Sequence, residues 1–520
     1  MNRTQLDVGA VAVGMTIDQP MVAAFLAVLG GTSLLAVTAR WFGRTDELPS
    51  LESWALADRR FGGLVTWFLL GGSIYTAYTF AAVPGLVYDA GAVGFFALPY
   101  TVIVYPLAFV LLPRMWRAAR DHGSITIADY VKARYGSAAL GLMVALTGIL
   151  ATMPYIALQL VGIRAVLSAC GLYPEGWRGD LVLIAVFAVL AVATFRHGLR
   201  APAVISLAKG AAIFGAVIGV VVAVLDRLGG TGRMFEAAAR NPEGHPPLLL
   251  SPDMYPAFAT LALGSALALL MYPHVTTAAF AASSAPTLRK VSIALPGWTA
   301  VLGLFGMLGI AALAAGVDAP SGTAEAAVPL LVKELMPSAL TGVLLGALVV
   351  GALVPAAVMS IAAAALFVRN IYVEYFQPYA TPKYQARVAQ WISLIAKVGA
   401  VAFILGLRNR DAINLQLLGG VWILQTFPAV ALGLFTRWRD ARALLAGWAA
   451  GMASGTLMVV WGGFSALVTV RAFGVAFPAY AAVVALVVNA AVTLALAAVR
   501  RWTPRRHPDD PLPSLPVRSA

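Results

Sequence analysis

Four ionisable side chains lie within long apolar segments of this 520-residue sequence, where charge is costly and usually functional. They are Arg164, Lys209, His274 and Lys397. Arg164 lies near one end of its segment, and the two lysines lie roughly 9 and 12 Å from an end of theirs. Each can therefore either extend to the interface or serve a buried site. None of the 23 Asp and Glu residues lies mid-segment, so we do not expect a membrane carboxylate that binds sodium or relays protons.

Uncharged polar groups form a second set of candidates. Tyr155 and Gln159 are one helical turn apart and share a face, while Gln416, Trp422 and Gln425 flank a Gly-Gly pair. A buried amide needs hydrogen-bond partners, so these side chains serve either packing or a bound solute. No Walker A, HExxH or Gly-x-Ser-x-Gly motif occurs, and no metal or nucleophile cluster lies within the apolar segments. We therefore expect solute binding without a cofactor, not an enzyme.

The composition indicates an integral membrane protein. Hydrophobic residues make up 60% of the chain, charged residues only 11%, and the mean hydropathy is +0.84. Such a chain has too little charge to coat a soluble surface of its size. The formal charge of +13 lies in loops between apolar segments, which fits basic cytoplasmic loops better than nucleic-acid binding. The single cysteine, Cys170, excludes an internal disulfide.

The apolar segments predict about thirteen transmembrane helices in an all-α fold. The first is too long, and lacks the basic leader, for a cleaved signal peptide. The predicted spans are 20–41, 64–88, 93–113, 138–168, 181–196, 203–225, 256–281, 293–316, 338–368, 389–407, 412–436, 443–466 and 474–499.

An odd number of spans places the two termini on opposite sides of the membrane. Lys and Arg concentrate in alternate loops, which predicts that those loops are cytoplasmic and the N-terminus is outside. The main basic clusters lie at 59–60, 114–120, 196–200, 437–442 and 500–506. We expect a bacterial inner-membrane protein whose residues 1–500 form one transporter domain, with a disordered cytoplasmic tail at 501–520.

Two predicted spans contain signals for a broken helix. One combines Gly, Ser and Thr over residues 71–79 with Pro-Gly at 84–85, and the other combines Gly-Ser at 264–265 with Tyr-Pro-His at 272–274. They lie five spans apart, so they would enter the membrane from opposite sides, as in the inverted repeats of secondary transporters. The alternative is that these small residues only permit close helix packing.

Several motifs resemble the sodium:solute symporter family. Residues 52–63 (Glu-Ser-Trp-Ala-Leu-Ala-Asp-Arg-Arg-Phe-Gly-Gly) and 83–88 (Val-Pro-Gly-Leu-Val-Tyr) are similar to the blocks around the family's second span. Residues 124–136 resemble its cytoplasmic Thr-Ile-x-Asp-Tyr motif, and Ala-Ala-Val-Met-Ser at 356–360 followed by Asn-Ile-Tyr at 370–372 resembles a later block. The matches occur in the family's order from about residue 48 to 440.

This resemblance implies a leucine-transporter-like fold with five-plus-five inverted repeats at about 64–225 and 256–436. Three further motifs resemble the branch that moves short monocarboxylates. They are Pro154-Tyr-Ile-Ala-Leu-Gln-Leu-Val-Gly, Met271-Tyr-Pro-His and Leu415-Gln-Leu-Leu-Gly-Gly-Val-Trp-Ile-Leu-Gln.

The resemblance also implies an ion site. In the family, backbone carbonyls of the second span and small or hydroxyl residues of the ninth hold sodium, which matches Gly72, Tyr75, Ala357 and Ser360. The residue after this serine is usually Ser or Thr but is Ile361 here, and Ser206 replaces an Asp that family members often carry. Lys209 follows Ser206 by one turn, and its ammonium can bond to the same carbonyls or lose its proton. We therefore predict that Lys209 occupies the sodium position.

The sequence thus predicts a cation-coupled uptake symporter for a small organic anion, with a proton as the coupling ion rather than Na⁺. A sodium-coupled symporter of another small solute is the main alternative, and a transporter-fold sensor is a remote one because little sequence follows the last span. We expect no nucleic-acid or obligate protein partner. The predicted substrate contacts are Ser73, Thr76, Tyr78, Gln159, His274, Gln416 and Gln425.

Overall fold

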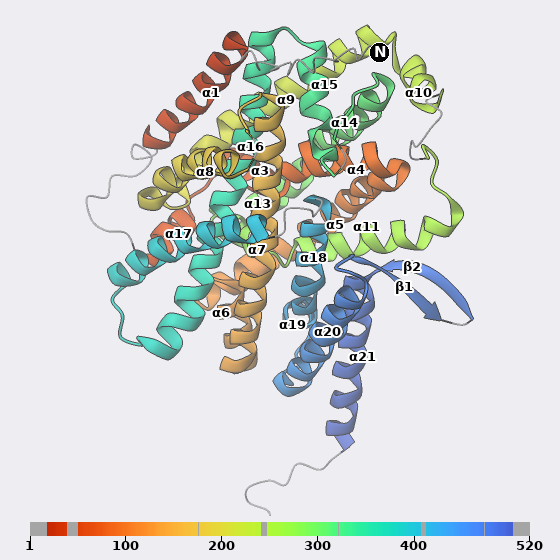
Figure 1. Cartoon of the computed structure of the whole chain (residues 1–520). Helices are drawn as coiled ribbons and strands as arrows, with labels where there is room; N and C mark the ends of the chain where they lie inside the picture. Colours follow the sequence, from red (N-terminus) through yellow and green to blue (C-terminus); the bar gives the residue numbers. More distant parts are fainter. Residues whose placement is uncertain are drawn as a thin grey trace, which may run out of the picture.

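A computed structural model describes residues 18–38, 50–174, 176–240, 247–320, 322–406, 412–472 and 474–502. Most of the predicted tail at 501–520 therefore lies outside the described residues. The described part is a bundle of helices, several of them short or broken, with one two-stranded hairpin that projects from its side (Figure 1).

The helices and strands follow one another along the chain, interspersed with short 3-10 or π turns that are labelled η. The first half of the chain contains α1 (Gln19–Thr38), α2 (Leu51–Leu56), η2 (Ala57–Arg59), α3 (Gly63–Ile74), η3 (Tyr78–Ala82), α4 (Val83–Ala90), η4 (Gly91–Phe96), α5 (Ala97–Asp121), α6 (Ile127–Tyr135), α7 (Ala138–Ala169), α8 (Trp177–His197), α9 (Arg200–Leu228) and α10 (Thr231–Arg240). The second half contains η5 (Pro252–Met254), α11 (Tyr255–Leu269), α12 (Pro273–Phe280), α13 (Ala285–Ala294), α14 (Pro296–Ala314), η6 (Ala324–Ala326), α15 (Ala327–Leu335), α16 (Ser338–Phe367), η7 (Val368–Phe376), α17 (Pro382–Gly406), α18 (Ala412–Ile423), η8 (Leu424–Thr426), α19 (Phe427–Phe435), α20 (Ala441–Trp461), β1 (Leu467–Ala472), β2 (Val475–Tyr480) and α21 (Ala481–Trp502).

Within the described residues, nine helical segments are long and apolar enough to cross a membrane, or ten if the bent pair α11 and α12 forms one span. α1 and α3 are apolar but shorter. The structure thus confirms a mostly helical membrane protein, whereas the number thirteen stays a prediction.

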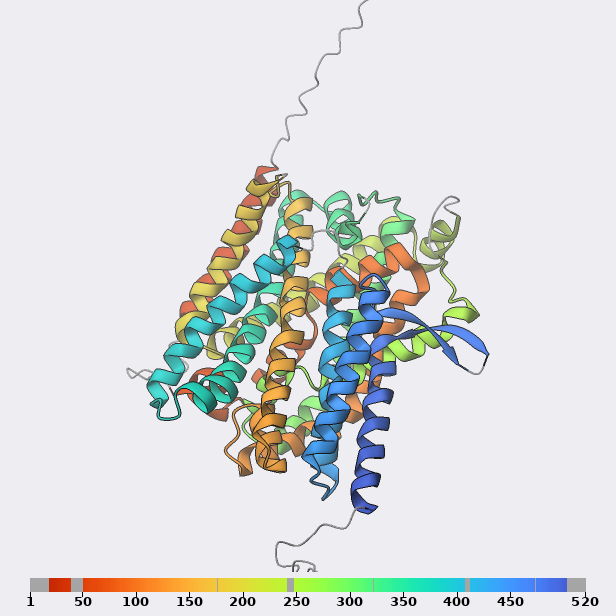
Figure 2. The same ribbon diagram turned by 60° about the horizontal axis from the view of Figure 1, so that its bottom comes forward.

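α7 and α16 form the centre of the bundle. Nearly all side chains of α16 are buried, as expected for a helix that is apolar on every face. α7 packs against α16 and α17 on one side and against α18 on the other (Figure 2). A Cβ atom on Gly162 of α7 would lie 2.6 Å from the Ala77 Cβ, so the absent side chain lets α7 approach the segment between α3 and η3.

The predicted break in the second span is present. α3 ends at Ile74, Tyr75 has an extended backbone (φ −93°, ψ 94°), and the chain resumes as the π turn η3 at Tyr78. Glycines 71 and 72 weaken the helix just before this point. The backbone between Ile74 and Tyr78 is therefore free to bond to side chains.

The second predicted break lies between α11 and α12. These two helices are bent by 46° relative to each other, and Tyr272 has an extended backbone (φ −62°, ψ 134°). Pro273 causes this geometry, because the residue before a proline is disfavoured in the helical region. α12 then starts afresh and packs against α3 and α16.

The predicted start of the last span differs from the structure. The last span was expected over 474–499, but Val475–Tyr480 is a strand that pairs with β1, and the helix starts only at Ala481. The hairpin packs against α11, where the Tyr480 N–H donates to Thr260 Oγ1 (3.0 Å). Its residues are as apolar as a membrane helix but are rich in Val and Phe, which favour strands.

Candidate functional site

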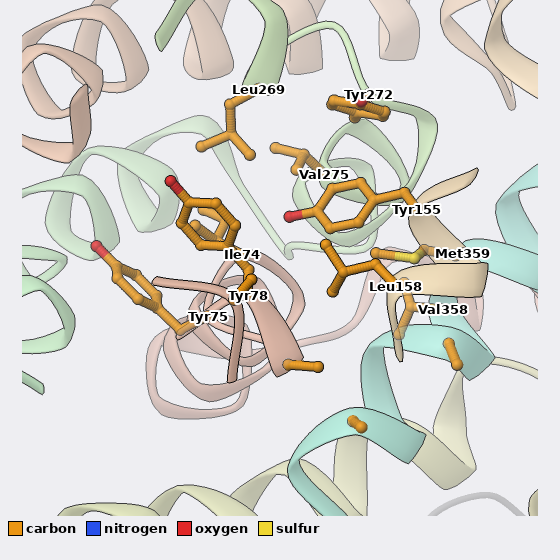
Figure 3. Packing of buried hydrophobic residues seen from close by; sticks show 14 of the residues in the cluster. Ile74, Tyr75, Tyr78, Tyr155, Leu158, Leu269, Tyr272, Val275, Val358 and Met359 are labelled. Atoms are coloured by element: carbon orange, nitrogen blue, oxygen red, sulfur yellow. The ribbon is translucent and has the colours of Figure 1, made fainter. Parts of the chain in front are cut away.

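The two helix breaks border a cluster of buried aromatic rings in the centre of the bundle. Tyr155 of α7 lies edge-on to Tyr272 (centroids 5.0 Å apart) and to His274 (5.1 Å). Tyr78 of η3 lies close by, edge-on to Tyr100. Figure 3 shows Tyr78, Tyr155 and Tyr272 surrounded by aliphatic side chains from α7, α11, α12 and α16. We call the rings of Tyr78, Tyr155, Tyr272 and His274, together with the aliphatic side chains around them, the central aromatic cluster.

Gln159 bridges the first break. Its Oε1 accepts from the Ala77 N–H (3.0 Å), and its Nε2 donates to Thr76 Oγ1 (3.2 Å) and to the Tyr155 carbonyl (3.1 Å). Thr76 Oγ1 also accepts from the Tyr78 N–H (3.1 Å). Gln159 and Thr76, both predicted to contact the substrate, therefore hold the unwound backbone.

Several buried polar atoms near the breaks have no hydrogen-bond partner within the part of the chain that the structure describes. They are Tyr78 Oη, Thr79 Oγ1, both ring nitrogens of His274, and Gln416 Oε1. Buried polar groups in native proteins are normally paired, so each unpaired group needs an explanation. Their gathering at two helix breaks marks this region as the candidate solute site, and it includes the predicted contacts Tyr78, His274 and Gln416.

Two predicted contacts have other partners. The Ser73 hydroxyl donates to the Leu69 carbonyl within α3 (2.6 Å). Gln425 is directed toward α21, where its Oε1 accepts from Asn489 Nδ2 (3.2 Å) and its Nε2 donates to the Ala482 carbonyl (3.4 Å). These contacts give Gln425 a structural explanation, although its predicted role in binding stays untested.

Lys209 lies beside the first break. Its Nζ donates to the carbonyl of Gly72 (2.8 Å) and to the carbonyl of Tyr75 (3.3 Å), and the residue is only 2% exposed. It forms no ion pair with any described residue. An ammonium group is thus bonded to the two carbonyls that the family resemblance assigns to sodium.

The other predicted ion-site residues are buried on α16. The Ser360 hydroxyl donates to the Ala357 carbonyl (2.8 Å), and Ile361 is fully buried. The side chain of Tyr75 is directed elsewhere, since its ring stacks on Trp298 and its hydroxyl bonds to Thr299 (2.8 Å). Tyr75 therefore offers only its backbone to a cation.

The remaining charged candidates lie in different surroundings. Lys397 of α17 is 2% exposed, and among the described residues it donates only to the Ser393 carbonyl one turn earlier (3.3 Å). Arg164 is half-buried near the end of α7. Lys209 and Lys397 are thus buried. Of the two alternatives from the sequence, a buried position and extension to the interface, the structure shows the first.

A polar network that sequence reasoning missed closes one end of the bundle. Asp129 caps α6 by accepting from the Thr126 N–H (3.3 Å), and it also accepts from Arg369 Nε (3.2 Å) and Asn370 Nδ2 (2.8 Å). Lys132 of α6 pairs with Glu374 (2.6 Å). The sequence signal for this network was the segment at 124–136, which was recognised only as a family motif and not as a set of contacts.

A strained segment lies before α3. Ala57, Asp58 and Arg59 all have positive φ (48°, 57° and 55°), which is unfavourable for residues with a side chain. Asp58 pairs with Arg200 at the start of α9 (2.7 Å), and Arg59 donates to Glu52 (2.8 Å). These contacts hold the strained backbone and connect α9 to the segment that leads into the first break.

A family model described as "Sodium:solute symporter family" matches residues 54–452. This chain belongs to the sodium:solute symporter family. A relative from Rhizobium johnstonii named monocarboxylate transport permease protein is 47% identical over 89% of this chain and 93% of its own length. The uncharacterized symporter YodF of Bacillus subtilis is 33% identical over 78% of this chain and 81% of its own length. The family and these names point to a transporter of a small solute rather than to an enzyme.

The fold is shared with a solved structure of a Na⁺-coupled sialic acid symporter in a substrate-bound, outward-open state. The TM-score is 0.73 at 16% identity, and the match covers 92% of this chain and 98% of that chain. The predicted leucine-transporter-like fold is thereby confirmed. The boundaries of the two repeats stay predictions.

Proposed function

We propose that this symporter takes up a short monocarboxylate together with a proton. The observation that carries the choice of ion is the hydrogen-bonding of Lys209 to the Gly72 and Tyr75 carbonyls. Sodium needs several oxygen ligands, and the position at Ile361 offers no side-chain oxygen. The ammonium supplies a +1 charge at these carbonyls without a bound metal ion.

The proton cycle follows from the position of Lys209. In its charged form the side chain ties α9 to the end of α3 and to the unwound backbone after it. When Nζ gives up its proton, the site loses one positive charge, and the bonds to the two carbonyls weaken because the donor is no longer charged. The first break then loses a constraint. Protonation from one side and proton release to the other thus couple the ion to movement of the broken helix.

A monocarboxylate suits the central aromatic cluster. The cluster is apolar, with a few unpaired polar groups, among them Tyr78 Oη and the His274 ring. α12 starts at Pro273, and the positive dipole end at its N-terminus favours a carboxylate, although the N–H groups of Val275 and Thr276 already donate to the Tyr272 carbonyl. The relative named as a monocarboxylate permease supports the same solute class.

We assign roles to the predicted residues on this basis. Gly72, Tyr75 and Lys209 form the ion site, with Ala357 and Ser360 on the α16 side. Tyr78, His274 and Gln416 contact the solute, while Thr76 and Gln159 shape the break that receives it. Ser73 and Gln425 support the site indirectly. Ser73 bonds to the backbone of α3, and Gln425 bonds to the backbone of α21.

Sodium-coupled transport of another small solute is the second candidate. It is favoured by the retention of Ser360 and Ala357 on α16 and by the unwound carbonyls of the first break. In that case Lys209 has to leave the carbonyls before sodium binds. The two candidates therefore differ in whether Lys209 remains in place during transport.

The proposal includes an orientation. The basic clusters at 59–60, 114–120 and 437–442 support an orientation in which the α6 end of the bundle faces the cytoplasm of a bacterial cell. The inverted repeats then span 64–225 and 256–436, with one break in each. Thiol-reactive probes applied from outside to single cysteines at the α6 end and at the α10 end would establish this topology.

The experiment for the solute uses purified protein in liposomes with inward proton and sodium gradients both present. Labelled lactate, pyruvate, acetate and proline are compared at equal concentration. We expect the three monocarboxylates to accumulate and proline to remain at the level of empty liposomes. Accumulation of proline alone would reject the solute class while leaving a symporter.

A further inference from the structure

A cavity of about 210 Å³ lies between the last turns of α7 and the segment formed by η6 and α15. On α7 it is lined by Val161, Arg164, Ala165 and Ser168, which share one helical face. Glu325 and Leu330 line the opposite wall. We call this the Arg164 cavity. It is distinct from the central aromatic cluster, none of whose rings lines it.

Two charged side chains line the cavity, Arg164 and Glu325, and only Glu325 has a hydrogen-bond partner among the described residues. Glu325 Oε1 accepts from the Ala412 N–H at the start of α18 (2.6 Å), so its carboxylate is engaged. Arg164 is half-buried and has no hydrogen bond or ion pair with any described residue. A guanidinium group that is partly withdrawn from water and faces a cavity is suited to an anion, and above all to a planar carboxylate that accepts two parallel N–H bonds.

The cavity lies beside α7, between one and two helical turns beyond Gln159. Arg164 follows Gln159 by five residues, a rise of roughly 7.5 Å along α7. The wall at η6 packs against α4 and η3, and a Cβ on Gly85 of α4 would lie 3.0 Å from the Ala324 backbone. The Asp129 network is at the other end of α7, and α6 and α15 lie at opposite ends of the bundle in Figure 1. The cavity is therefore on the side that the proposed orientation places outside.

We propose that the Arg164 cavity is a capture site that binds the carboxylate of the incoming organic anion before it reaches the central cluster. Arg164 holds the carboxylate, the Ser168 hydroxyl offers a further polar contact, and Val161, Ala165 and Leu330 contact the short carbon chain. The volume fits an acid of a few carbon atoms and is below the range of pockets for drug-sized ligands. The proposal rests on the proposed function, because it takes the solute to be a monocarboxylate.

The first test is the concentration dependence of lactate uptake in proteoliposomes. We expect Arg164→Gln to raise the KM about tenfold or more with the maximal rate changed less than twofold, and Arg164→Lys to give a smaller increase. The matched control is Arg178→Gln, since Arg178 follows the same end of α7 but lies over the Trp177 ring and does not line the cavity. An unchanged KM in Arg164→Gln would overturn the capture site.

The second test does not depend on transport. Cys170 is the sole cysteine, so Ser168→Cys in a Cys170→Ala background places a single thiol in the cavity, where Ser168 is exposed. We expect millimolar lactate to slow its labelling by an anionic methanethiosulfonate about fivefold, glycerol to have no effect, and Arg164→Gln to abolish the protection. Labelling that lactate does not slow would contradict the proposal.

The two tests separate the capture site from the proposed function. Protection of the thiol by lactate without lactate uptake would reject the monocarboxylate symporter and retain an anion site at Arg164. Lactate uptake with an unchanged KM in Arg164→Gln and no protection would reject the capture site and retain the symporter.

Discussion

Replacing Lys209 by methionine isolates the proposed coupling role of the ammonium group. Methionine has a similar length and fits apolar surroundings, but it cannot donate to the Gly72 and Tyr75 carbonyls. Hydrogen bonds from a charged donor contribute about 1.5–3 kcal/mol each. The substitution also removes a buried charge, whose desolvation offsets part of this loss. We therefore expect folded protein, with proton coupling as the property that is lost.

The size of the effect follows from the gradient. A difference of one pH unit across the membrane supplies about 1.36 kcal/mol per proton. This free energy is enough to accumulate the solute tenfold. With one proton per monocarboxylate and a gradient of two pH units, the native protein should accumulate lactate about 100-fold. A Lys209→Met protein that still exchanges solute should bring lactate only to equal concentrations on both sides, a ratio of about 1.

The assay compares net accumulation with exchange in the same liposomes. Lys397→Met is the matched control, because Lys397 is the other buried lysine and bonds only to the Ser393 carbonyl within the described part of the chain. We expect Lys209→Met to retain exchange of labelled for unlabelled lactate and to lose accumulation, and Lys397→Met to retain both. Proton-driven accumulation that survives in Lys209→Met would refute the coupling role.

Three further substitutions test other parts of the account. Gln159→Leu leaves the Ala77 N–H without its acceptor, so we expect about 1–3 kcal/mol of destabilisation. The assay is the melting temperature in detergent, which should fall. An unchanged melting temperature would show that water replaces the amide. His274→Phe keeps a buried ring against Tyr155 and Tyr272 but removes two nitrogens that have no hydrogen bond in the described structure. The KM for lactate should therefore rise severalfold with little loss of stability; an unchanged KM would make His274 a packing residue. Asp129→Asn weakens the contact with Arg369 and should make single cysteines at the α6 end react faster with thiol reagents, whereas Glu236→Gln, in an exposed pair, should leave their reactivity unchanged.

Much of the fold was predictable because the membrane limits the choices. The long apolar segments became helices, and the breaks followed from Gly71-Gly72 and from Pro273, whose backbone effects are local. The hairpin at 467–480 was missed because residues 474–480 were assigned by hydropathy alone to the last span, and residues 467–473 to the loop before it. Its strands are fixed by pairing with each other and by the contact of Tyr480 with Thr260, 220 residues earlier in the chain.

The site was predictable only where neighbours in sequence determine it. Lys209 lies one turn after Ser206, so its position beside the first break followed from the family motif. The partners of Gln159 and Gln425 come from other helices, and hydropathy gives no indication that one amide faces the break and the other faces Asn489. The link between Asp129 and Asn370 joins residues 241 positions apart and was missed for the same reason.

The most direct test of the central claim is the uptake of labelled lactate by the native protein under one gradient at a time. Liposomes are prepared with an inward proton gradient in sodium-free buffer, or with an inward sodium gradient at equal pH on both sides. The account predicts accumulation with the proton gradient alone and only equilibration with the sodium gradient alone. Accumulation that requires sodium and is indifferent to the proton gradient would contradict it.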